Sequence, residues 1–165
     1  QYGFDHLMIA AQGYQESRLD QNVRSSAGAV GVMQLLPSTA ADKNVGIPDI
    51  TQVEPNIHAG VKYLHFLRNR YFDDPSLDPF NAALFSFAAY NAGPARVRGL
   101  RRMAEESGLD PNKWFNHVEL IAAKEIGRET VQYVSNIYKY YLAYRLITDK
   151  QNQRNDGRSI GKDSD

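Results

Sequence analysis

Hydrophobic residues recur along most of this chain at the three- and four-residue spacing that is typical of amphipathic helices. The run over 80–90 is rich in alanine and phenylalanine and apolar on nearly every side, which predicts a central, buried helix. No segment alternates between apolar and polar residues in the manner of a strand. The sequence therefore predicts an all-α fold, with helices over 5–17, 57–71, 80–90, 94–105, 114–123 and 128–146.

The length of 165 residues is typical of one domain. The last stretch, 150–165, holds a single aliphatic residue, Ile160, among polar and charged ones. Such a segment cannot bury enough apolar surface to offset the entropy that it loses on ordering. We therefore predict one compact helical domain over residues 1–149 and a flexible polar tail over residues 150–165.

Basic and acidic residues are equal in number, 19 of each, which argues against a nucleic-acid partner because such proteins normally need a net basic face. The densest basic run, 96–102, is followed by Glu105 and Glu106, which is typical of a solvated helix face. No apolar stretch approaches the roughly 18 residues of a membrane span. The first residue is Gln1 rather than methionine, which we interpret as a processed product or an excised domain.

Metal and cofactor signatures are missing from the sequence. There is no cysteine, which excludes thiolate metal sites and cysteine nucleophiles. His58 and His65 lie two turns apart on one predicted helix, too far to share a zinc ion without another element. No glycine pattern typical of a phosphate-binding loop follows a strand. The sequence therefore predicts no metal and no cofactor.

Among the carboxylates, Glu16 stands out because it ends the first predicted helix directly after an apolar face. Burial against such a face favours the protonated carboxyl group, as a general acid for glycosidic cleavage requires. Gly13, on the same helix, leaves space that either an approaching sugar or a closely packed neighbour would explain. Taken alone, Glu16 fits better a plainer interpretation, in which it faces solvent and pairs with Arg18 or a lysine.

Three further segments carry side chains that suit sugar recognition. Gln34 follows a glycine turn, and its amide can both donate and accept hydrogen bonds. Tyr90 and Asn91 end the buried helix and offer an aromatic face and an amide, although an ordinary helix–turn–helix connection has the same composition. Glu129 and Tyr133 occupy positions i and i+4 of the last predicted helix and therefore share one face.

Together these segments resemble the soluble lytic transglycosylase family, bacterial enzymes with a goose-type-lysozyme-like fold that cut the glycan strands of peptidoglycan. The family's Glu-Ser, Gly-Leu-Met-Gln, Ala-Tyr-Asn-Ala-Gly and Glu-Thr…Tyr-Val elements are similar, in the same order, to residues 16–17, 31–34, 89–93 and 129–134. The resemblance spans about residues 4–146. Val32 and Leu36 depart from the family pattern by apolar exchanges, which we expect to adjust the pocket's shape rather than its chemistry.

The resemblance implies a lytic transglycosylase catalytic domain over 1–149, with a sugar-binding groove and Glu16 as the only catalytic carboxylate. Glu16 would protonate the oxygen that leaves with N-acetylglucosamine and then, as a base, take the proton of the C6 hydroxyl of N-acetylmuramic acid. That hydroxyl attacks C1 of its own sugar, so the product is a 1,6-anhydromuramoyl end and no water is consumed. The substrate-binding residues that the resemblance implies are Ser17, Ser25, Gln34, Leu36, Tyr90, Asn91, Glu129 and Tyr133.

The partner that the resemblance implies is the peptidoglycan glycan strand, without nucleic acid and without a membrane span in this chain. Within the family the chain is most similar to membrane-bound members that carry this module behind a solute-binding-like domain. We therefore also expect other domains of a longer parent protein, a periplasmic location and an association with the outer membrane. Two alternatives stay open: a hydrolytic lysozyme on the same fold, with Asp20 or Asp42 as the base, and a peptidoglycan-binding module without activity.

Overall fold

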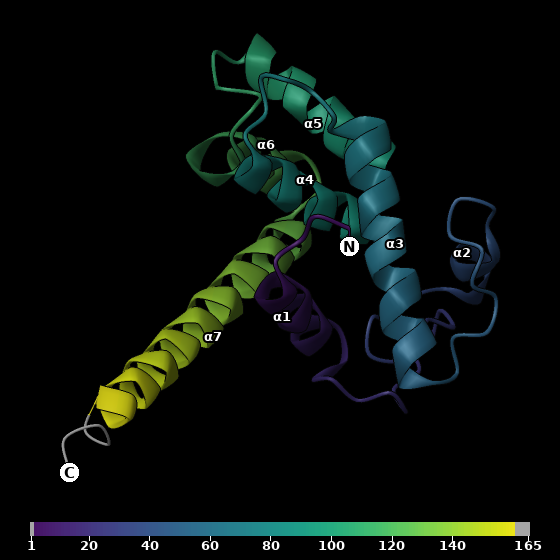
Figure 1. The fold of residues 1–165 in the computed structure, drawn as a ribbon. Helices are drawn as coiled ribbons and strands as arrows, with labels where there is room; N and C mark the ends of the chain where they lie inside the picture. The colour runs from purple at the N-terminus through teal and green to yellow at the C-terminus, as the bar shows by residue number, and fades with distance from the viewer. Residues whose placement is uncertain (1, 161–165) are drawn as a thin grey trace.

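The computed structural model describes the backbone of residues 2–160 and the side chains of residues 2–154, and most of this range is helical (Figure 1). The prediction of an all-α fold is confirmed, because β pairing within the described residues is limited to two isolated bridges, Arg24–Val30 and Val30–Leu35. The helices in chain order are α1 (His6–Ser17), α2 (Pro37–Ala41), α3 (Val53–Tyr71), α4 (Pro79–Ala92), α5 (Pro94–Glu106), η1 (Trp114–Val118), α6 (Glu119–Glu125) and α7 (Arg128–Ile160).

Helix α4 is the central element, as its apolar composition predicts. Asp78 caps its start by accepting a hydrogen bond from the backbone N–H of Asn81 at 2.9 Å, and the ring of Pro79 restricts the backbone to angles that suit a first turn. Every residue from 82 to 89 is buried, and α4 contacts α3, α5 and α7 (Figure 1). The C-terminal end of α4 is therefore held between other helices.

Two segments differ from the helices that the periodicity predicts. Helix α2 has only five residues, too few to show an apolar stripe, and the sequence did not predict it. The predicted helix over 114–123 is interrupted, because Phe115 is extended with ψ 134° and Asn116 is left-handed with φ 62°. Regular helix resumes at Glu119.

Helix α7 packs against α1, α4 and α6 and then extends away from the body of the molecule (Figure 1). It continues to Ile160, past residue 149, where the sequence predicts that a flexible tail begins. Residues 150–160 are thus helical rather than irregular, because an existing helix gains a hydrogen bond for each residue that it adds. Residues 161–165 lie outside the described residues, and the division into a domain and a tail stays a prediction.

A small second core lies beneath the loops between α1 and α3. Tyr63 of α3 and Tyr90 of α4 pack against both this core and the main one, so they join the loop region to the helical body. The second core holds in place the segment that carries Gln34. Its buried residues are Val30, Leu35, Ala40, Val45, Ile50 and Ala59.

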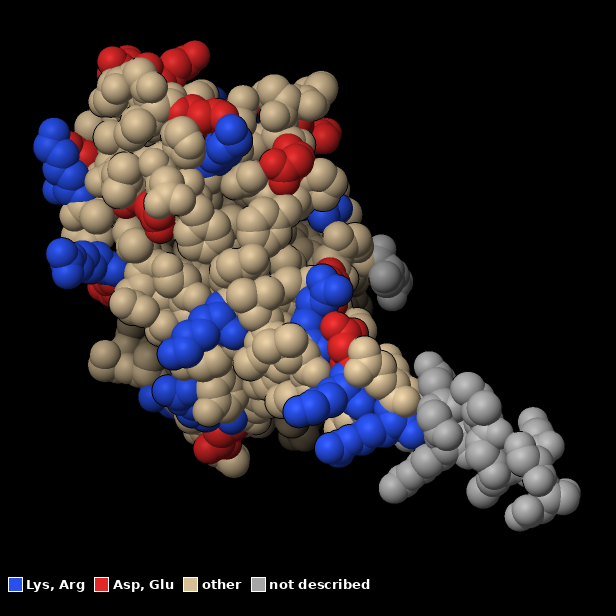
Figure 2. Space-filling view, turned by 90° about the vertical axis from the view of Figure 1, so that its left-hand side faces the viewer, with Lys and Arg blue, Asp and Glu red and all other residues tan. Residues whose placement is uncertain are grey.

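Charged side chains of both signs are spread over the face shown in Figure 2, with wide neutral surface between them. On α5, Arg102 lies 3.9 Å from Glu106, and both side chains are exposed. This arrangement is the solvated helix face that the sequence predicts for the basic run on α5.

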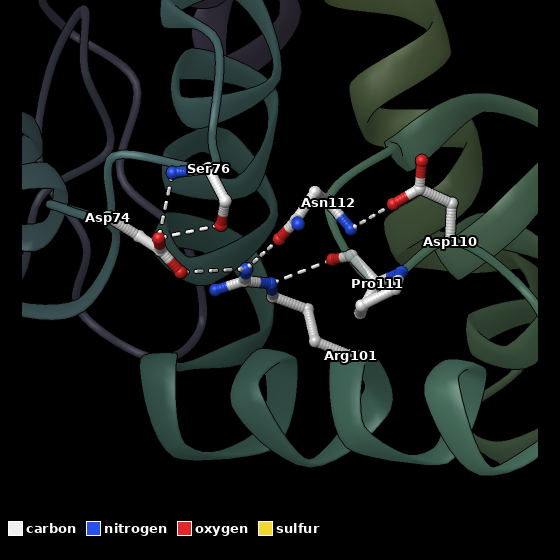
Figure 3. Close-up of polar contacts among 6 residues, drawn as sticks. All are labelled: Asp74, Ser76, Arg101, Asp110, Pro111 and Asn112. Atoms are coloured by element: carbon white, nitrogen blue, oxygen red, sulfur yellow. Dashed lines mark hydrogen bonds and ion pairs between the residues drawn. The ribbon is translucent and has the colours of Figure 1, made fainter.

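Arg101 of α5 ties together two loops (Figure 3). Its Nε donates to the carbonyl oxygen of Pro111 at 2.8 Å, and its Nη2 donates to Oδ1 of Asn112 at 2.6 Å and lies 3.7 Å from a carboxylate oxygen of Asp74. The guanidinium also stacks 5.1 Å from the ring centre of Phe85. Because only 15% of the Arg101 side chain is exposed, water competes weakly for these contacts, and they stabilise the fold.

The variant Arg101→Leu is expected to lower the free energy of unfolding by about 2 kcal/mol, because it removes two hydrogen bonds from a charged donor while keeping the apolar contact. Urea denaturation measures this loss. The exposed neighbour provides the control: Arg102→Gln should change the free energy by less than about 0.5 kcal/mol. Equal losses in the two variants would contradict the role assigned to Arg101.

Candidate active site

Glu16 lies in the last turn of α1, where its carboxyl group meets helix α7. The hydroxyl of Tyr133 donates a hydrogen bond to Oε1 of Glu16 at 2.5 Å. Tyr133 is buried and Glu16 is half-buried. Helix α1 ends directly afterwards, because Arg18 adopts the left-handed conformation with φ 58°. The carboxyl group is therefore fixed at a helix end rather than free in solvent, in contrast to the plainer interpretation of the sequence.

Burial determines the acidity of this carboxyl group. Removal from water disfavours the charged form and raises the pKa of Glu16 from 4.5 to about 7, while the hydrogen bond from Tyr133 acts in the opposite direction. The pKa values of Tyr90 and Tyr133 both lie well above the usual value for tyrosine. Burial is the main cause, and the nearby negative charge of Glu16 is the second. Glu16 can therefore both release and take up a proton near neutral pH, whereas the two phenols keep theirs.

The end of α1 packs closely against the segment 31–34. A Cβ atom at Gly13 would lie 3.0 Å from side-chain carbons of Leu19 and Val32, so close packing, rather than an approaching sugar, explains this glycine. The Oγ of Ser17 donates to the carbonyl oxygen of Val32 at 3.0 Å, and Ser17 is buried. The hydroxyl proton of Ser17 is therefore donated within the protein, although the resemblance implies that this residue binds substrate.

Residues 30–35 form a tight turn that α3 and α4 hold from two sides. The Oδ1 of Asn56 accepts a hydrogen bond from the N–H of Met33 at 2.8 Å, and its Nδ2 donates to the carbonyl oxygen of Val30 at 2.8 Å. The hydroxyl of Tyr90 donates to the carbonyl oxygen of Met33, also at 2.8 Å. Tyr90 therefore has a structural hydrogen bond in addition to its place near Glu16.

Gln34 occupies the tight turn in the left-handed conformation, with φ 44°. Its Nε2 donates to the carbonyl oxygens of Val23 and Gly31, at 3.2 and 2.9 Å. Its Oε1 has no hydrogen bond within the described part of the chain, and the residue is half-buried. Such strained conformations concentrate at functional sites, and the amide oxygen can accept a hydrogen bond from a ligand.

The end of α4 meets the start of α7 at Asn91. The hydroxyl of Thr130 donates to Oδ1 of Asn91 at 2.7 Å, which leaves the exposed amide NH₂ of Asn91 as a donor. Glu129, the preceding residue of α7, is exposed. Hydrogen bonds thus connect the end of α1 with α7, the end of α4 with the start of α7, and the end of α4 with the turn that carries Gln34.

Ser25 and Leu36 make no hydrogen bond to Glu16 or to the helices around it within the described residues. Ser25 is exposed, and its Oγ accepts a hydrogen bond from the N–H of Ala29 at 3.0 Å. Leu36 precedes α2 with 40% of its surface exposed. Their roles in substrate binding stay predictions.

Three buried or half-buried polar residues that the sequence motifs do not indicate support the site residues through hydrogen bonds. Gln12 donates from Nε2 to the hydroxyl of Tyr133 at 3.1 Å and is fully buried. Asn56 holds the tight turn, and Gln21 accepts a hydrogen bond from the N–H of Val32 at 3.2 Å. For Gln12 and Asn56 the available signal was a polar residue on a buried helix face, a position that requires a hydrogen-bonding partner.

An apolar cavity of about 420 Å³ lies between α1 and α3, but none of the predicted site residues lines it. The sugar-binding groove that the resemblance implies therefore stays a prediction. Across residues that the structure describes, no group of three or more His, Asp or Glu side chains could hold a metal ion. No helix in the same range is both long and apolar enough to cross a membrane.

The variant Asn56→Ala is expected to lower the free energy of unfolding by about 3 kcal/mol, because it leaves the buried N–H of Met33 without an acceptor and removes a donor to Val30. Chemical denaturation measures the loss. Asn69→Ala, an exposed change on the same helix, should cost less than about 0.5 kcal/mol. A loss at Asn56 no greater than that at Asn69 would show that the tight turn does not depend on this amide.

Comparison with known proteins identifies the family. Residues 1–114 match the model of the transglycosylase SLT domain. Membrane-bound lytic murein transglycosylase F of Desulfosudis oleivorans is 40% identical over 153 residues, which cover 85% of this chain and 33% of the relative. The protein of the same name from Pseudomonas fluorescens is 32% identical over 160 residues, covering 89% of this chain and 32% of the relative. This chain thus spans about a third of the length of the curated relatives that it matches.

Solved structures agree with this result. An inactive glutamate-to-glutamine mutant of lytic transglycosylase Slt from Pseudomonas aeruginosa matches with a TM-score of 0.67 and 28% identity, over 90% of this chain and 22% of that chain. The 70 kDa soluble lytic transglycosylase of Escherichia coli matches with a TM-score of 0.56 and 25% identity, over 88% of this chain and 22% of that chain. The family model ends at Trp114, before Tyr133, so the helix that contacts Glu16 lies outside the matched range. Because the matched range exceeds half of the chain, this chain belongs to the transglycosylase SLT domain family.

Proposed function

We propose that this chain is the catalytic module of a lytic transglycosylase, which cleaves the β-1,4 bond between N-acetylmuramic acid and N-acetylglucosamine without consuming water. The environment of Glu16 carries the proposal: a half-buried carboxyl group with a pKa raised to about 7, fixed by a hydrogen bond from Tyr133. The names of the relatives, lytic murein transglycosylases, support the substrate class. The inactive glutamate-to-glutamine mutant of Slt supports a reaction that depends on a carboxyl group.

Glu16 acts twice in the proposed reaction. In its neutral form it donates its proton to the glycosidic oxygen, while the bond between that oxygen and C1 of N-acetylmuramic acid breaks. N-acetylglucosamine leaves with a new hydroxyl group, and Glu16 becomes a carboxylate. The C6 oxygen of the muramoyl residue then bonds to C1, and its proton returns to Glu16. Protons therefore balance over one turnover, and the carboxyl group regains its starting form.

A second carboxylate is not needed, because the C6 hydroxyl is already attached to the sugar that it attacks. The two carboxylates considered above as the base of a hydrolytic reaction, Asp20 and Asp42, are engaged in local hydrogen bonds. Asp20 is exposed and accepts hydrogen bonds from the backbone and side chain of Asn22 at 2.8 and 3.0 Å. Asp42 accepts corresponding bonds from Asn44, which hold the pKa of Asp42 below its usual value and make it a weaker base. These contacts favour the intramolecular route.

Polar groups around Glu16 supply the contacts that a neutral sugar needs. The free Oε1 of Gln34 and the exposed amide of Asn91 can bind hydroxyl or acetamido groups. Glu129, at the exposed start of α7, can do the same from the other side. Ser25 and Leu36, both exposed, are proposed to contact the substrate as well.

The location and partners of the whole protein follow from the substrate. We place the module where peptidoglycan lies, in the periplasm, as part of a longer protein like its curated relatives, whose names describe them as membrane-bound. An association with the outer membrane belongs to the same proposal. Fractionation of cells that produce the parent protein tests both.

Mass spectrometry of digestion products tests the reaction directly. Purified peptidoglycan is incubated with the protein in H₂¹⁸O, and the masses of the released muropeptides are measured. The proposal predicts ends that are lighter by one water and carry no ¹⁸O. Reducing ends with ¹⁸O would instead identify a hydrolytic lysozyme. No product together with co-sedimentation of the protein with peptidoglycan would identify a binding module.

A further inference from the structure

We propose that Gln12 is a positioning residue which, through the hydroxyl of Tyr133, keeps the acid proton of Glu16 on Oε2. The inference rests on the proposed function for its role in catalysis, but the hydrogen-bond chain itself can be measured without activity. Gln12, Tyr133 and Glu16 form this chain across the contact between α1 and α7.

The geometry defines the direction of each hydrogen bond. The Nε2 of Gln12 lies 3.1 Å from the hydroxyl oxygen of Tyr133, and an amide nitrogen can only donate. The phenol has one proton, which it donates to Oε1 of Glu16 at 2.5 Å. Because Gln12 fills an acceptor position of the phenol oxygen, the phenol proton is directed toward Glu16. Gln12 is fully buried, so water does not replace its amide.

This arrangement assigns different tasks to the two oxygens of Glu16. Oε1 already accepts a hydrogen bond from the hydroxyl of Tyr133. A proton placed on Oε1 itself would lie between Oε1 and the phenol oxygen and would clash with the phenol proton. The neutral acid must therefore carry its proton on Oε2, which has no hydrogen bond within the described part of the chain. After that proton has left, Tyr133 still donates to Oε1, and Oε2 is again the free base. Both proton transfers then use the same oxygen.

The other atom of the amide argues for a functional role of Gln12. Its Oε1 is buried without a hydrogen-bond partner in the described structure, which costs stability. An apolar side chain of similar size would pack at the same place without that cost. The titratable groups near Glu16 are the hydroxyls of Tyr133 on α7 and Tyr90 on α4, both of which feel the charge of Glu16, and Tyr90 packs against Tyr63 of α3. Gln12 is bonded to the hydroxyl that touches the carboxylate.

The test is a titration of the Glu16 carboxyl carbon by NMR in protein labelled with ¹³C in its glutamate side chains; the signal is assigned by its absence in Glu16→Gln. In Gln12→Met the phenol proton can turn away from Glu16, and we expect the midpoint to rise by about half a pH unit. In Tyr133→Phe the bond is lost, and the midpoint should rise by about one to two units. The double variant should match Tyr133→Phe, because Gln12 acts only through this phenol.

Leu100→Ala, a buried change on α5, provides a control for general loss of stability and should leave the midpoint unchanged. A second measurement needs no variant at Gln12: in the wild-type protein, the side-chain amide signals of Gln12 should titrate with the midpoint of Glu16. An unchanged midpoint in Gln12→Met, additive shifts in the double variant, or a Gln12 amide that does not respond to pH would each overturn the inference.

Kinetics connect the hydrogen-bond chain to catalysis. If the module cleaves peptidoglycan as proposed, Gln12→Met should lower kcat about tenfold with KM unchanged, and the alkaline limb of its rate profile should shift with the NMR midpoint. A wild-type protein that releases no muropeptides but shows the expected titrations would refute the proposed function and leave the hydrogen-bond chain standing. The opposite pattern, an active enzyme with unmoved midpoints, would refute the chain alone.

Discussion

Replacing Glu16 by glutamine is expected to lower the rate of peptidoglycan cleavage about a thousandfold or more, because the amide has the shape of the carboxyl group but cannot release a proton to the leaving oxygen. The hydrogen bond from Tyr133 can still be made to the amide oxygen, so the fold should persist. Muropeptide release from purified peptidoglycan measures the rate, and the helical circular dichroism signal checks the fold.

A matched control separates the role of Glu16 from a general effect of lost negative charge. Glu105→Gln removes an exposed carboxylate from α5 and should keep the wild-type rate. Glu16→Asp retains an acid but shortens the side chain and so moves the carboxyl group away from Tyr133. Its cleavage rate should lie between those of Glu16→Gln and Glu105→Gln. Activity above about a tenth of wild type in Glu16→Gln would exclude Glu16 as the general acid.

Glu16→Gln is also expected to stabilise the protein at alkaline pH, by an amount that grows from nearly zero at pH 4 to as much as about 3 kcal/mol at pH 8. The folded protein holds the Glu16 proton up to a pH of about 7, whereas the unfolded chain loses it near 4.5. Between these values the folded state binds more protons, so the wild-type free energy of unfolding falls as the pH rises. Glutamine cannot ionise, so the free energy of unfolding of the variant lacks the part of this decline that Glu16 causes.

Urea denaturation of both proteins at several pH values measures this difference. Other titrating groups are the same in the two proteins, so their contributions cancel when the wild-type curve is subtracted from that of the variant. Because Glu16 is half-buried, solvent screening makes 3 kcal/mol an upper value. Parallel curves, with no growth of the difference between pH 5 and pH 8, would mean that the carboxyl group is not strongly desolvated.

The amino-acid sequence by itself determined the helical architecture and the order of the site segments. Apolar spacing located α1, α3 and α7, because a helix must bury one stripe of its surface wherever it packs. The apolar composition of residues 80–90 located α4, and Pro94 at a first turn located α5. The same reasoning missed the short α2, which has no stripe, and it indicated neither the break within residues 114–118 nor the helical continuation of α7 to Ile160. Local motifs also singled out Glu16, Gln34 and Tyr90, which stand at helix ends and in a turn, and Tyr133, which shares a helix face with Glu129.

Tertiary structure alone decided how these groups act. The bond between Glu16 and Tyr133 joins residues 117 positions apart, and no local pattern contains that distance. The pKa of Glu16 depends on the water that α1 and α7 exclude together, so the sequence could predict that burial would raise it but not that burial occurs. Gln12 and Asn56 show the same limit. Each reads as an ordinary polar residue in the sequence, and its partner is known only once separate segments of the chain have been packed together.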